Sequence, residues 1–325
     1  MNKKLWAGVD IGGTKTAVVV SSDPPVVLTR SEFPTLPARG PEPAIDQIKS
    51  MLRAALSDMG KGSESLAGIG VSCGGPLDSQ RGIIQAPPNL STWIDTPIVD
   101  ILEEEFGCPV YLENDANAGA LAEHRFGAGK GSHNMIFLTM GTGFGAGIIL
   151  GDRIYQGTNG MAGEIGHVRL TSDGPVGYHK AGSAEGWISG GGVAQWATAA
   201  VRTAREQGES SQLLEFPPDC QVTARDVGLA AAKGDALARR IVTQCGEKLG
   251  AALAILVDIL NPERIVIGGL AMRLGDFLLE PARRIVAQEA LPHSVSVCRI
   301  VPAALGESIG DVAALCIAMD AGEAP

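Results

Sequence analysis

The sequence predicts an α/β fold built from two similar halves. Residues 7–20 read as a short apolar strand, a Gly-Gly-Thr-Lys break and a second apolar strand. Residues 134–150 repeat this pattern with a strand, a Gly-Thr-Gly turn and a returning strand. Helical and strand-like segments alternate after each of these units. Two such copies predict a duplicated α/β fold with a cleft between its halves.

Length and composition exclude several classes of protein. With 325 residues, 45% of them apolar, the chain is long enough for two domains with sizeable cores. The net charge of −10 argues against nucleic acid or an acidic membrane as the main partner. The apolar run after Lys3-Lys4 is too short for a secretory leader, and the run at 249–260 is too short for a membrane span. The six scattered cysteines lack a CxxC pair and predict reduced thiols in a cytoplasmic protein.

The first elements follow from the spacing of apolar residues. After the opening hairpin, residues 31–43 are rich in proline, and we expect a connection there. Residues 43–59 carry apolar side chains at helical spacing, and Gly60 ends that helix. Residues 66–72 form a buried strand that runs into the loop Cys73-Gly74-Gly75-Pro76.

The remaining elements continue the alternation. In chain order, we expect a helix over 96–106 that stops at Gly107, a strand over 110–113, a helix over 116–126, strands over 134–140 and 146–150, a helix over 242–260, a strand over 264–270 and a helix over 306–319. The last helix is expected to pack back on the N-terminal half. This order gives each half its own sheet and helices.

Two glycine-rich turns are the strongest candidates for a ligand site. The first turn consists of Gly12, Gly13, Thr14 and Lys15, and the second of Gly141, Thr142 and Gly143. Glycine leaves backbone N–H groups open to a close approach by phosphate, and Thr14 and Lys15 add a hydroxyl donor and a cation. Asp10, beside the first turn, can hold a metal-bound water. Either turn alone could be an ordinary hairpin, but the pair predicts a nucleotide gripped at its phosphates.

Asp115 follows a strand and begins a helix. A carboxylate at a helix N-terminus is stabilised by the unpaired N–H groups of the first turn, so we expect it to be ionised at neutral pH. The same position also suits an ordinary N-cap, because Asp is a favoured capping residue. The sequence alone leaves both interpretations open.

Polar residues between glycines mark a further loop. Glu164 and His167 lie three residues apart in Gly163-Glu164-Ile165-Gly166-His167, and such a loop suits a polyhydroxylated ligand. Glu185 lies between Gly182 and Gly186. Taken singly, each of these side chains is equally compatible with an ordinary surface position.

In combination these motifs resemble the ROK family of sugar kinases, which belongs with hexokinase, actin and the Hsp70 ATPase domain. The resemblance covers nearly the whole chain and rests on Asp10-Ile11-Gly12-Gly13-Thr14-Lys15, Glu113-Asn114-Asp115-Ala116-Asn117-Ala118, Gly141-Thr142-Gly143-Phe144-Gly145-Ala146-Gly147 and Ala162-Gly163-Glu164-Ile165-Gly166-His167. It implies two actin-like ATPase (ribonuclease H-like) domains. We expect an N-terminal domain of residues 1–115 plus 306–325 and a C-terminal domain of residues 116–305.

The resemblance also implies a role for each motif. Asp115 would be the general base for a sugar hydroxyl. The sugar would be held by Asn114, Glu164, His167 and Glu185, with a backbone contact from Gly75. The phosphates of ATP would lie at Gly12, Gly13, Thr14, Lys15, Gly141, Thr142 and Gly143, the adenosine near Gly268 and Gly269, and Mg²⁺ near Asp10, held through water.

The chain departs from this family in one loop. The family pattern after the Gly163–His167 segment has three cysteines that join the histidine in a structural zinc site. Those cysteine positions fall on Val176, Tyr178 and Ser183 here. One or two histidines cannot close a tetrahedral zinc site, so we predict no zinc. Another group must then orient His167, and Tyr178 or His179 could serve.

The expected activity is ATP-dependent phosphorylation of a hexose hydroxyl, with glucose as the first expectation. An N-acetylglucosamine or N-acetylmannosamine kinase and a fructokinase are alternatives. A non-catalytic sugar- or nucleotide-binding protein is the alternative from another class. A DNA-binding repressor is disfavoured, since only nine residues precede Asp10 and the chain is acidic. The family resemblance further implies a homodimer.

Overall fold

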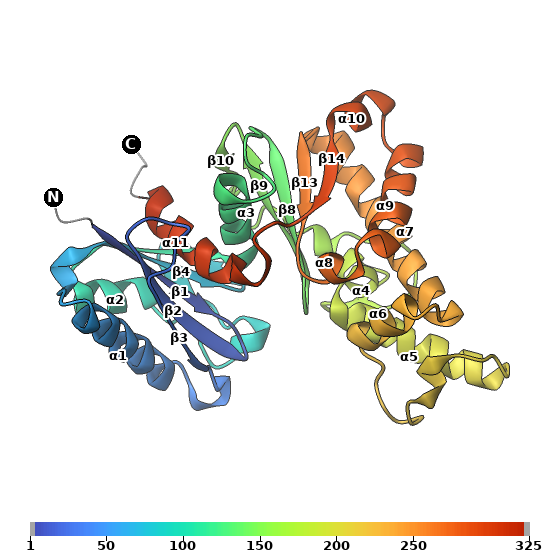
Figure 1. The fold of residues 1–325 in the computed structure, drawn as a ribbon, viewed down its shortest axis with the longest axis horizontal. Coiled ribbons are helices and arrows are strands. Elements are labelled where there is room, and N and C mark those ends of the chain that lie inside the picture. The colour runs from blue at the N-terminus through green and yellow to red at the C-terminus, as the bar shows by residue number, and fades with distance from the viewer. Residues whose placement is uncertain (1–3, 322–325) are drawn as a thin grey trace. The chain divides into compact units, whose positions relative to one another are not determined.

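The computed structural model describes residues 4–321. By its internal contacts the chain divides into two compact units (Figure 1). Unit 1 comprises Met1–Lys130, Gln156–Gly160 and Leu305–Pro325, and unit 2 comprises Gly131–Tyr155 and Met161–Ala304. Residues 1–3 and 322–325, which belong to the expected N-terminal domain, lie outside the described residues.

Unit 1 contains a five-stranded mixed sheet in the order β3-β2-β1-β4-β7. Its strands are β1 (Leu5–Ile11), β2 (Lys15–Ser21), β3 (Thr29–Pro34), β4 (Leu66–Cys73) and β7 (Val110–Asn114), and β5 (Leu77–Asp78) and β6 (Ile83–Ile84) form a separate ribbon. The α-helices are α1 (Glu42–Asp58), α2 (Ile98–Phe106), α3 (Asp115–Phe126) and α11 (Ile309–Ala321). β1 pairs antiparallel with β2 and parallel with β4, and β4 pairs parallel with β7.

The alternation of side chains along β1 sets the two faces of this sheet. Val9 and Ile11 are buried in a core that includes Ile48 and Leu52 of α1. Successive side chains on a strand point to opposite faces, so Asp10 lies on the other face. Burying each large apolar side chain in such a core contributes about 1.5–3 kcal/mol.

Helix α11 covers the face that carries Asp10, opposite α1 and α2 (Figure 1). Small residues allow this close approach. A Cβ added to Gly70 of β4 would lie 2.1 Å from the carbonyl oxygen of Ala314, and one added to Gly8 of β1 would lie 2.9 Å from the Cβ of Ala314. The expected packing of the last helix on the N-terminal half is confirmed.

Two expectations for unit 1 differ from the structure. Residues 31–34, expected to be part of a connection, belong to strand β3, whose side chains are mostly exposed because it is an edge strand. The expected domain boundary also differs: it lies after Asp115, whereas the first segment of unit 1 continues to Lys130. Helix α3 stays in unit 1, where it packs on α11, and Arg125 of α3 pairs with Asp320 of α11 at 2.6 Å.

Unit 2 contains a second five-stranded mixed sheet, in the order β10-β9-β8-β13-β14. Its strands are β8 (Met135–Met140), β9 (Phe144–Leu150), β10 (Arg153–Ile154), β13 (Arg264–Ile267) and β14 (Arg299–Pro302), and β11 (Val176–Gly177) and β12 (Lys180–Ala181) form a ribbon. The α-helices are α4 (Ala184–Ile188), α5 (Gly190–Glu206), α6 (Ala224–Ala232), α7 (Ala236–Leu260), α8 (Leu270–Leu274), α9 (Asp276–Glu289) and α10 (Pro292–Val297).

The two sheets share one topology. β8 pairs antiparallel with β9 and parallel with β13, and β13 pairs parallel with β14, as β1, β2, β4 and β7 do in unit 1. The expected strand over 264–270 ends earlier, because Gly268 and Gly269 lead directly into α8. The expected helix over 242–260 begins earlier, at Ala236, where Asp235 accepts a hydrogen bond from the backbone of Ala238.

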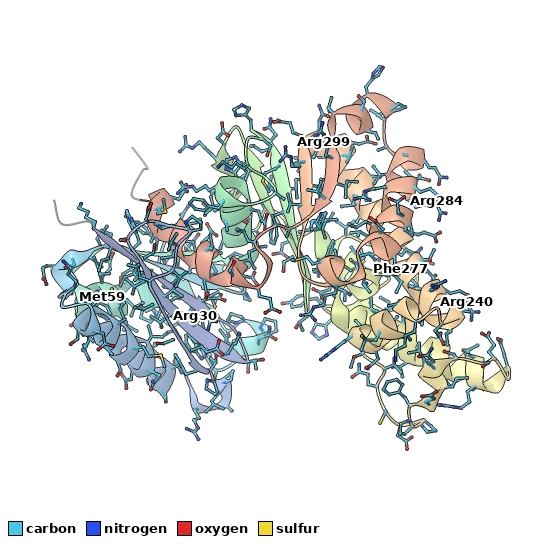
Figure 2. The ribbon with its side chains drawn as sticks, viewed as in Figure 1. Arg30, Met59, Arg240, Phe277, Arg284 and Arg299 are labelled. Carbon is cyan, nitrogen blue, oxygen red and sulfur yellow. The ribbon has the colours of Figure 1, made fainter. Side chains whose placement is uncertain are left out.

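Helices α7 and α9 form the largest helix pair of unit 2. Gly246 and Gly250 of α7 face the backbone of α9 so closely that an added Cβ would lie 2.5 Å from the carbonyl oxygen of Leu278 and 2.6 Å from that of Ala282. Arg284 lies exposed on α9 (Figure 2). It pairs with Glu247 of α7 at 2.8 Å. Within residues 4–321, no helix combines the length and the apolar run that a membrane span requires.

Candidate active site

The end of strand β1 places Asp10 next to polar groups of unit 1. Asp10 is the register partner of Ser72 on β4, whose hydroxyl hydrogen-bonds its carboxylate. A Cβ added to Gly310 would lie 2.4 Å from Oδ2 of Asp10, so this carboxylate reaches the start of α11. The pKa of Asp10 is raised to about 6, chiefly by burial and then by the negative charges of Asp115 and Asp311. A nearby cation would therefore favour the ionised form of the Asp10 carboxyl group.

The first glycine turn is tight and well held. The N–H of Gly12 donates to the carbonyl of Lys15 at 3.0 Å, and the N–H of Thr35 donates to the carbonyl of Thr14 at 3.1 Å. Gly13 packs on Asn89, whose Cβ would lie 2.6 Å from an added Cβ. Glycine at position 13 is thus required by the packing of the turn itself.

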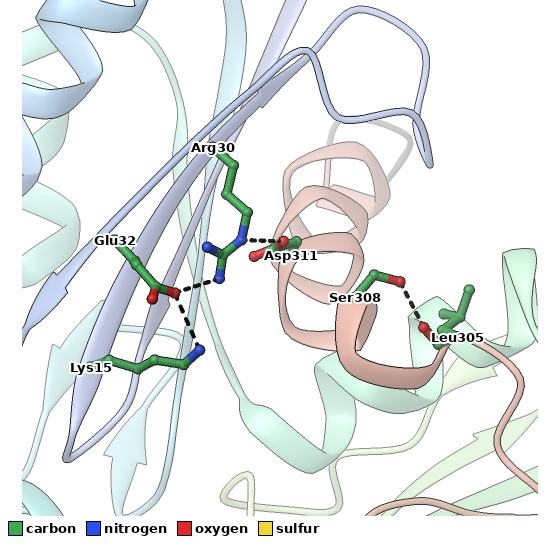
Figure 3. A network of polar contacts seen from close by, with 6 residues as sticks. All are labelled: Lys15, Arg30, Glu32, Leu305, Ser308 and Asp311. Carbon is green, nitrogen blue, oxygen red and sulfur yellow. Dashed lines mark hydrogen bonds and ion pairs between the residues drawn. The ribbon is translucent and has the colours of Figure 1, made fainter.

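Lys15 belongs to a network of ion pairs that reaches α11 (Figure 3). Its ammonium lies 3.2 Å from Glu32, and Arg30 contacts the same carboxylate at 2.8 Å and Asp311 at 2.8 Å. The side chains of Lys15 and Glu32 are 62% and 45% exposed. Exposed pairs of this kind contribute little to stability, so Lys15 can exchange Glu32 for another anion at small cost.

Asn114 and Asp115 lie at the junction of β7 and α3. The N-cap of α3 is Asn114, whose Oδ1 accepts a hydrogen bond from Ala116 N at 2.9 Å, and Oδ1 of Asp115 accepts from the same N–H at 2.9 Å. β4 and β7 are parallel neighbours, which brings Gly75 beside Asn114; a Cβ added to Gly75 would lie 3.4 Å from Nδ2 of Asn114. The capping position is thus filled by Asn114, and Asp115 is the first residue of the helix.

Asp115 as a whole residue is accessible to solvent, while the protein around its carboxyl group raises the pKa of that group above the ordinary value by desolvation. The N–H of Ala116 acts in the opposite direction and is outweighed. The helix N-terminus alone would lower the pKa of Asp115, whereas the pKa is raised in the folded protein. A raised pKa makes the ionised carboxylate a stronger proton acceptor.

Glu113 is a supporting residue that the sequence interpretation missed. It is buried at 7% exposure, and its Oε1 accepts hydrogen bonds from Asn114 N at 2.8 Å and from Nδ2 of Asn117 at 3.0 Å. Its Oε2 accepts from Nε2 of Gln156. Glu113 thereby fixes the strand end that presents Asn114 and Asp115. The polar run Glu113-Asn114-Asp115 was the available signal, but it did not reveal Gln156 as a partner.

The second glycine turn, in unit 2, connects β8 and β9. The N–H of Gly141 donates to the carbonyl of Gly143 at 3.1 Å, and the N–H of Gly190 donates to the carbonyl of Gly141 at 2.8 Å. Gly141 and Thr142 are exposed, and a Cβ added to Gly141 would meet no atom within 4 Å. The outer side of this turn is open to a ligand.

Glu164, His167 and Glu185 all lie near the start of β9 in unit 2. The Gly163–His167 segment packs on β9 through Gly166, where an added Cβ would lie 2.0 Å from the carbonyl oxygen of Phe144. Glu185, on α4, accepts a hydrogen bond from Phe144 N through Oε2 at 3.2 Å. The expected sugar loop therefore touches the second glycine turn within one unit.

Gly268 and Gly269 have structural reasons to be glycine. The N–H of Gly268 donates to the carbonyl of Leu138 at 2.9 Å, which extends the pairing of β13 with β8. Gly269 has a φ of +62°, and an added Cβ would lie 2.2 Å from the carbonyl oxygen of Met140. Their expected contact with adenosine stays a prediction.

A two-stranded hairpin occupies the loop where the family pattern has cysteines. Val176 lies in β11, Tyr178 in the turn and Ser183 at the N-cap of α4. The ring of His167 contacts the ring of Tyr178 edge-on, with centroids 5.6 Å apart. Among residues 4–321, no cluster of three or more His, Cys, Asp or Glu side chains is arranged to hold a metal ion.

Comparison with known proteins identifies relatives along almost the whole chain. Residues 6–321 match the model of the ROK family. A glucokinase of Halalkalibacterium halodurans is 37% identical over 312 residues, which cover 95% of this chain and 93% of the relative. A bifunctional enzyme NanE/NanK of Brucella melitensis is 36% identical over 305 residues, which cover 93% of this chain and 51% of the relative.

The same fold occurs in solved structures. A ROK family glucokinase from Streptomyces griseus, in complex with glucose and AMPPNP, aligns with a TM-score of 0.77 and 31% identity. The alignment covers 97% of this chain and 99% of that one. The expected α/β fold of the actin-like ATPase type, with one mixed sheet in each unit, is confirmed.

Proposed function

The chain belongs to the ROK family, and from this premise we propose that it is a sugar kinase that transfers the γ-phosphoryl group of ATP to a hydroxyl of glucose. The observation that carries the proposal is the junction of β7 and α3. There an exposed Asp115 with a raised pKa lies beside Asn114, which Glu113 orients. The glucokinase relatives, one of them seen with glucose and AMPPNP, support glucose as the acceptor.

Asp115 accepts the proton of the attacking hydroxyl in this mechanism. Phosphoryl transfer passes through a loose transition state, so positioning and charge neutralisation contribute most of the rate enhancement. The hydroxyl becomes acidic only late in the reaction, which suits a carboxylate base. Nδ2 of Asn114, which the N-cap leaves available, and the backbone at Gly75 hold neighbouring sugar oxygens.

The two glycine turns bind the phosphates of ATP. The N–H of Gly12 closes the turn by donating to the carbonyl of Lys15, so Gly12 lines the site through its lack of a side chain. Gly13 and Thr14 offer backbone N–H groups, Thr14 adds a hydroxyl, and Lys15 exchanges Glu32 for a phosphate oxygen. Gly141 lines the second turn, where its own N–H donates to the carbonyl of Gly143, and Thr142 and Gly143 offer their N–H groups to the phosphates. Gly268 and Gly269 accommodate the adenosine.

The surroundings of Asp10 fit a hydrated magnesium ion. Its carboxylate is desolvated and lies in the negative field of Asp115 and Asp311, which a cation would relieve. Mg²⁺ keeps several waters and needs few protein ligands, so one carboxylate suffices to hold it through water. When bound, the ion neutralises charge on the phosphates.

Glu164, His167 and Glu185 of unit 2 bind the remaining sugar hydroxyls. Carboxylates accept from hydroxyls, and the imidazole donates or accepts according to its tautomer. The hairpin that replaces the cysteine loop leaves no thiolate ligand, and we propose that the enzyme works without zinc. We also propose a homodimer, which light scattering on the purified protein tests.

An ADP-release assay over a panel of sugars tests the proposed activity. The panel contains glucose, fructose, mannose, allose, N-acetylglucosamine and N-acetylmannosamine, each with ATP and Mg²⁺. We expect the highest kcat/KM for glucose, and no change after treatment with a zinc chelator. A higher kcat/KM for another sugar would reassign the acceptor.

The rival class is a protein that binds sugar without turning it over. Isothermal titration with glucose, in the presence of AMPPNP, separates this outcome from a failed preparation. Binding of glucose without ADP release for any sugar would overturn the kinase proposal.

A further inference from the structure

The hairpin of β11 and β12 in unit 2 has an unusual turn. Tyr178 and His179 are its two central residues, with φ values of +42° and +63°. Two-residue hairpin turns of this kind favour Asn-Gly or Gly-Gly, because only small residues adopt positive φ without cost. A bulky aromatic residue in this conformation is strained, and such strain persists only where the surroundings impose it.

Side chains of the surrounding segments hold this hairpin. Gln195 of α5 forms a double clamp on Val176: its Oε1 accepts from the backbone N–H at 3.2 Å, and its Nε2 donates to the carbonyl at 2.9 Å. Nη1 of Arg169 donates to the carbonyl of Ala181 at 2.6 Å. The base of the hairpin is therefore fixed on both strands.

The hairpin also touches two of the residues proposed to bind sugar. Gly177 packs so tightly that an added Cβ would lie 2.8 Å from the Cβ of Glu185. Nζ of Lys180 donates to the backbone carbonyl of His167 at 2.7 Å. The ring of Tyr178 lies edge-on to the ring of His167, at 5.6 Å between centroids and 66° between planes.

The exposure of Tyr178 shows that the strain does not serve a hydrophobic core. The residue is 61% exposed, and its ring contacts the rings of His167 and His179. An edge-on aromatic pair has a preferred geometry, so it restrains the rotation of the partner ring. The partner here is the imidazole of His167.

We infer that the strained hairpin is a positioning device in which Tyr178 fixes the ring plane of His167 toward the sugar. The inference rests on the proposed function, in which His167 binds a sugar hydroxyl. Tyr178 is thus a positioning residue that sets sugar affinity through His167. It takes no part in the transfer of the phosphoryl group.

Glycine substitutions separate positioning from folding. Tyr178→Gly removes the ring but suits the positive φ, so the hairpin should stay folded with unchanged or higher thermal stability. We expect KM for glucose to rise roughly 3- to 10-fold, as for the loss of one aromatic pair. We expect KM for ATP to stay within about twofold of the wild-type value, because such an aromatic pair acts only on its partner ring.

Two variants serve as matched controls. His179→Gly relieves the same strain at the next residue and keeps Tyr178, although it removes a ring that contacts Tyr178 at 5.6 Å between centroids. KM for glucose should therefore rise much less than in Tyr178→Gly, and an equal rise would overturn the inference. Tyr178→Phe keeps the ring and should also behave as wild type. A rise in KM for Tyr178→Phe equal to that for Tyr178→Gly would overturn the inference, because it would assign the effect to a contact made by the phenol hydroxyl.

A spectroscopic test does not depend on turnover. The chain has five histidines, so a protein labelled with ¹³C at Cε1 of histidine gives five signals, and His167→Asn assigns one of them. The ring of Tyr178 should shift the His167 signal through its ring current, in the wild type, Tyr178→Phe and His179→Gly but not in Tyr178→Gly. An unmoved His167 signal in Tyr178→Gly would overturn the inference. Absence of ADP release in the wild type would contradict the proposed function alone.

Discussion

The two sheets share one strand order but differ in where they carry charge. In unit 1, the turn after β1 is flanked by Asp10 and Lys15, and β7 is followed by Asp115. In unit 2, the matching turn is Gly141-Thr142-Gly143, and the residue after β14 is Ala303. Both copies thus offer backbone N–H groups at a glycine turn. Only unit 1 carries ionisable residues on the strands of the turn itself, whereas the carboxylate near the turn of unit 2, Glu185, comes from α4.

This difference shows how a duplicated fold can divide one reaction. A backbone turn binds an anion without a charged side chain, so the shared element suits phosphate in both copies. Proton transfer requires a titratable group, and it is proposed for Asp115, which directly follows strand β7 of unit 1. Substitutions that change one unit at a time test this division of roles.

The largest expected effect follows from removing the proposed base. Asp115→Asn keeps the size of the side chain but replaces the carboxylate, which can accept a proton, by a neutral amide. We expect kcat to fall by about 10²- to 10⁴-fold with glucose binding largely retained, as measured by ADP release and by titration calorimetry. Asp100→Asn, at an exposed position of α2 in the same unit, is the control and should leave kcat unchanged. Wild-type turnover by Asp115→Asn would remove the chemical distinction between the units.

Substitution of matching glycines tests whether both turns bind phosphate. We expect Gly141→Ala to keep the wild-type melting temperature, since its Cβ meets open space, but to raise KM for ATP about tenfold or more. We expect Gly13→Ala to lower the melting temperature as well, because its Cβ would lie 2.6 Å from the Cβ of Asn89. An unchanged KM for ATP in Gly141→Ala would mean that the turn of unit 2 lies outside the phosphate site.

The charge in unit 1 should cost stability in the absence of metal. The pKa of Asp10 is raised to about 6 from the ordinary 3.8. The stability that the protonated carboxyl group contributes to the fold is therefore fully present below pH 3.8 and is lost as the pH rises through 6. Asp10→Asn should therefore raise the free energy of unfolding at pH 8 by on the order of 1–3 kcal/mol, and by less at pH 4.5. Urea denaturation at both pH values, without Mg²⁺, measures this. A gain of equal size at the two pH values would point to packing as its cause.

The smallest expected effect concerns the exposed pair of Lys15 and Glu32. Glu32→Gln frees the ammonium for phosphate, and KM for ATP should fall by less than about fivefold, with a stability change under about 1 kcal/mol. The difference should shrink at high salt, because exposed charges are screened. Initial rates at low and high salt measure it, with Glu104→Gln on α2 as the control. A rise in KM would show that Glu32 orients Lys15 for binding.

Most of the fold could be predicted because its signals are local. The two strand–glycine–strand units have matching apolar runs, and Gly107 ends α2 with a φ of +65°, as a C-terminal glycine should. Strand β3 was missed because it is an edge strand with exposed, polar residues at 29–32, so apolar alternation gave no sign of it. The place of α3 in unit 1 depends on α11, almost 200 residues later, and no local pattern shows such a contact.

The residues of the candidate site stand out in the sequence one by one, but the contacts that support them do not. Asp115, Glu164 and the glycines stand out by residue type and spacing. Their supports do not: Ser72 becomes the neighbour of Asp10 only through the register of β1 and β4, and Gln156 reaches Glu113 only in the folded chain. The raised pKa of Asp115 also depends on surrounding protein that the sequence cannot place.

The close packing of α11 on Gly8 and Gly70 has a consequence for synthesis on the ribosome. The strands of unit 1 are translated first, but the helix that covers one face of their sheet is translated only after all of unit 2. During that interval the nascent sheet exposes a glycine-lined surface, and unit 2 can complete its own core before unit 1 does. A chain released before α11 is translated would lack the helix that covers one face of the unit 1 sheet.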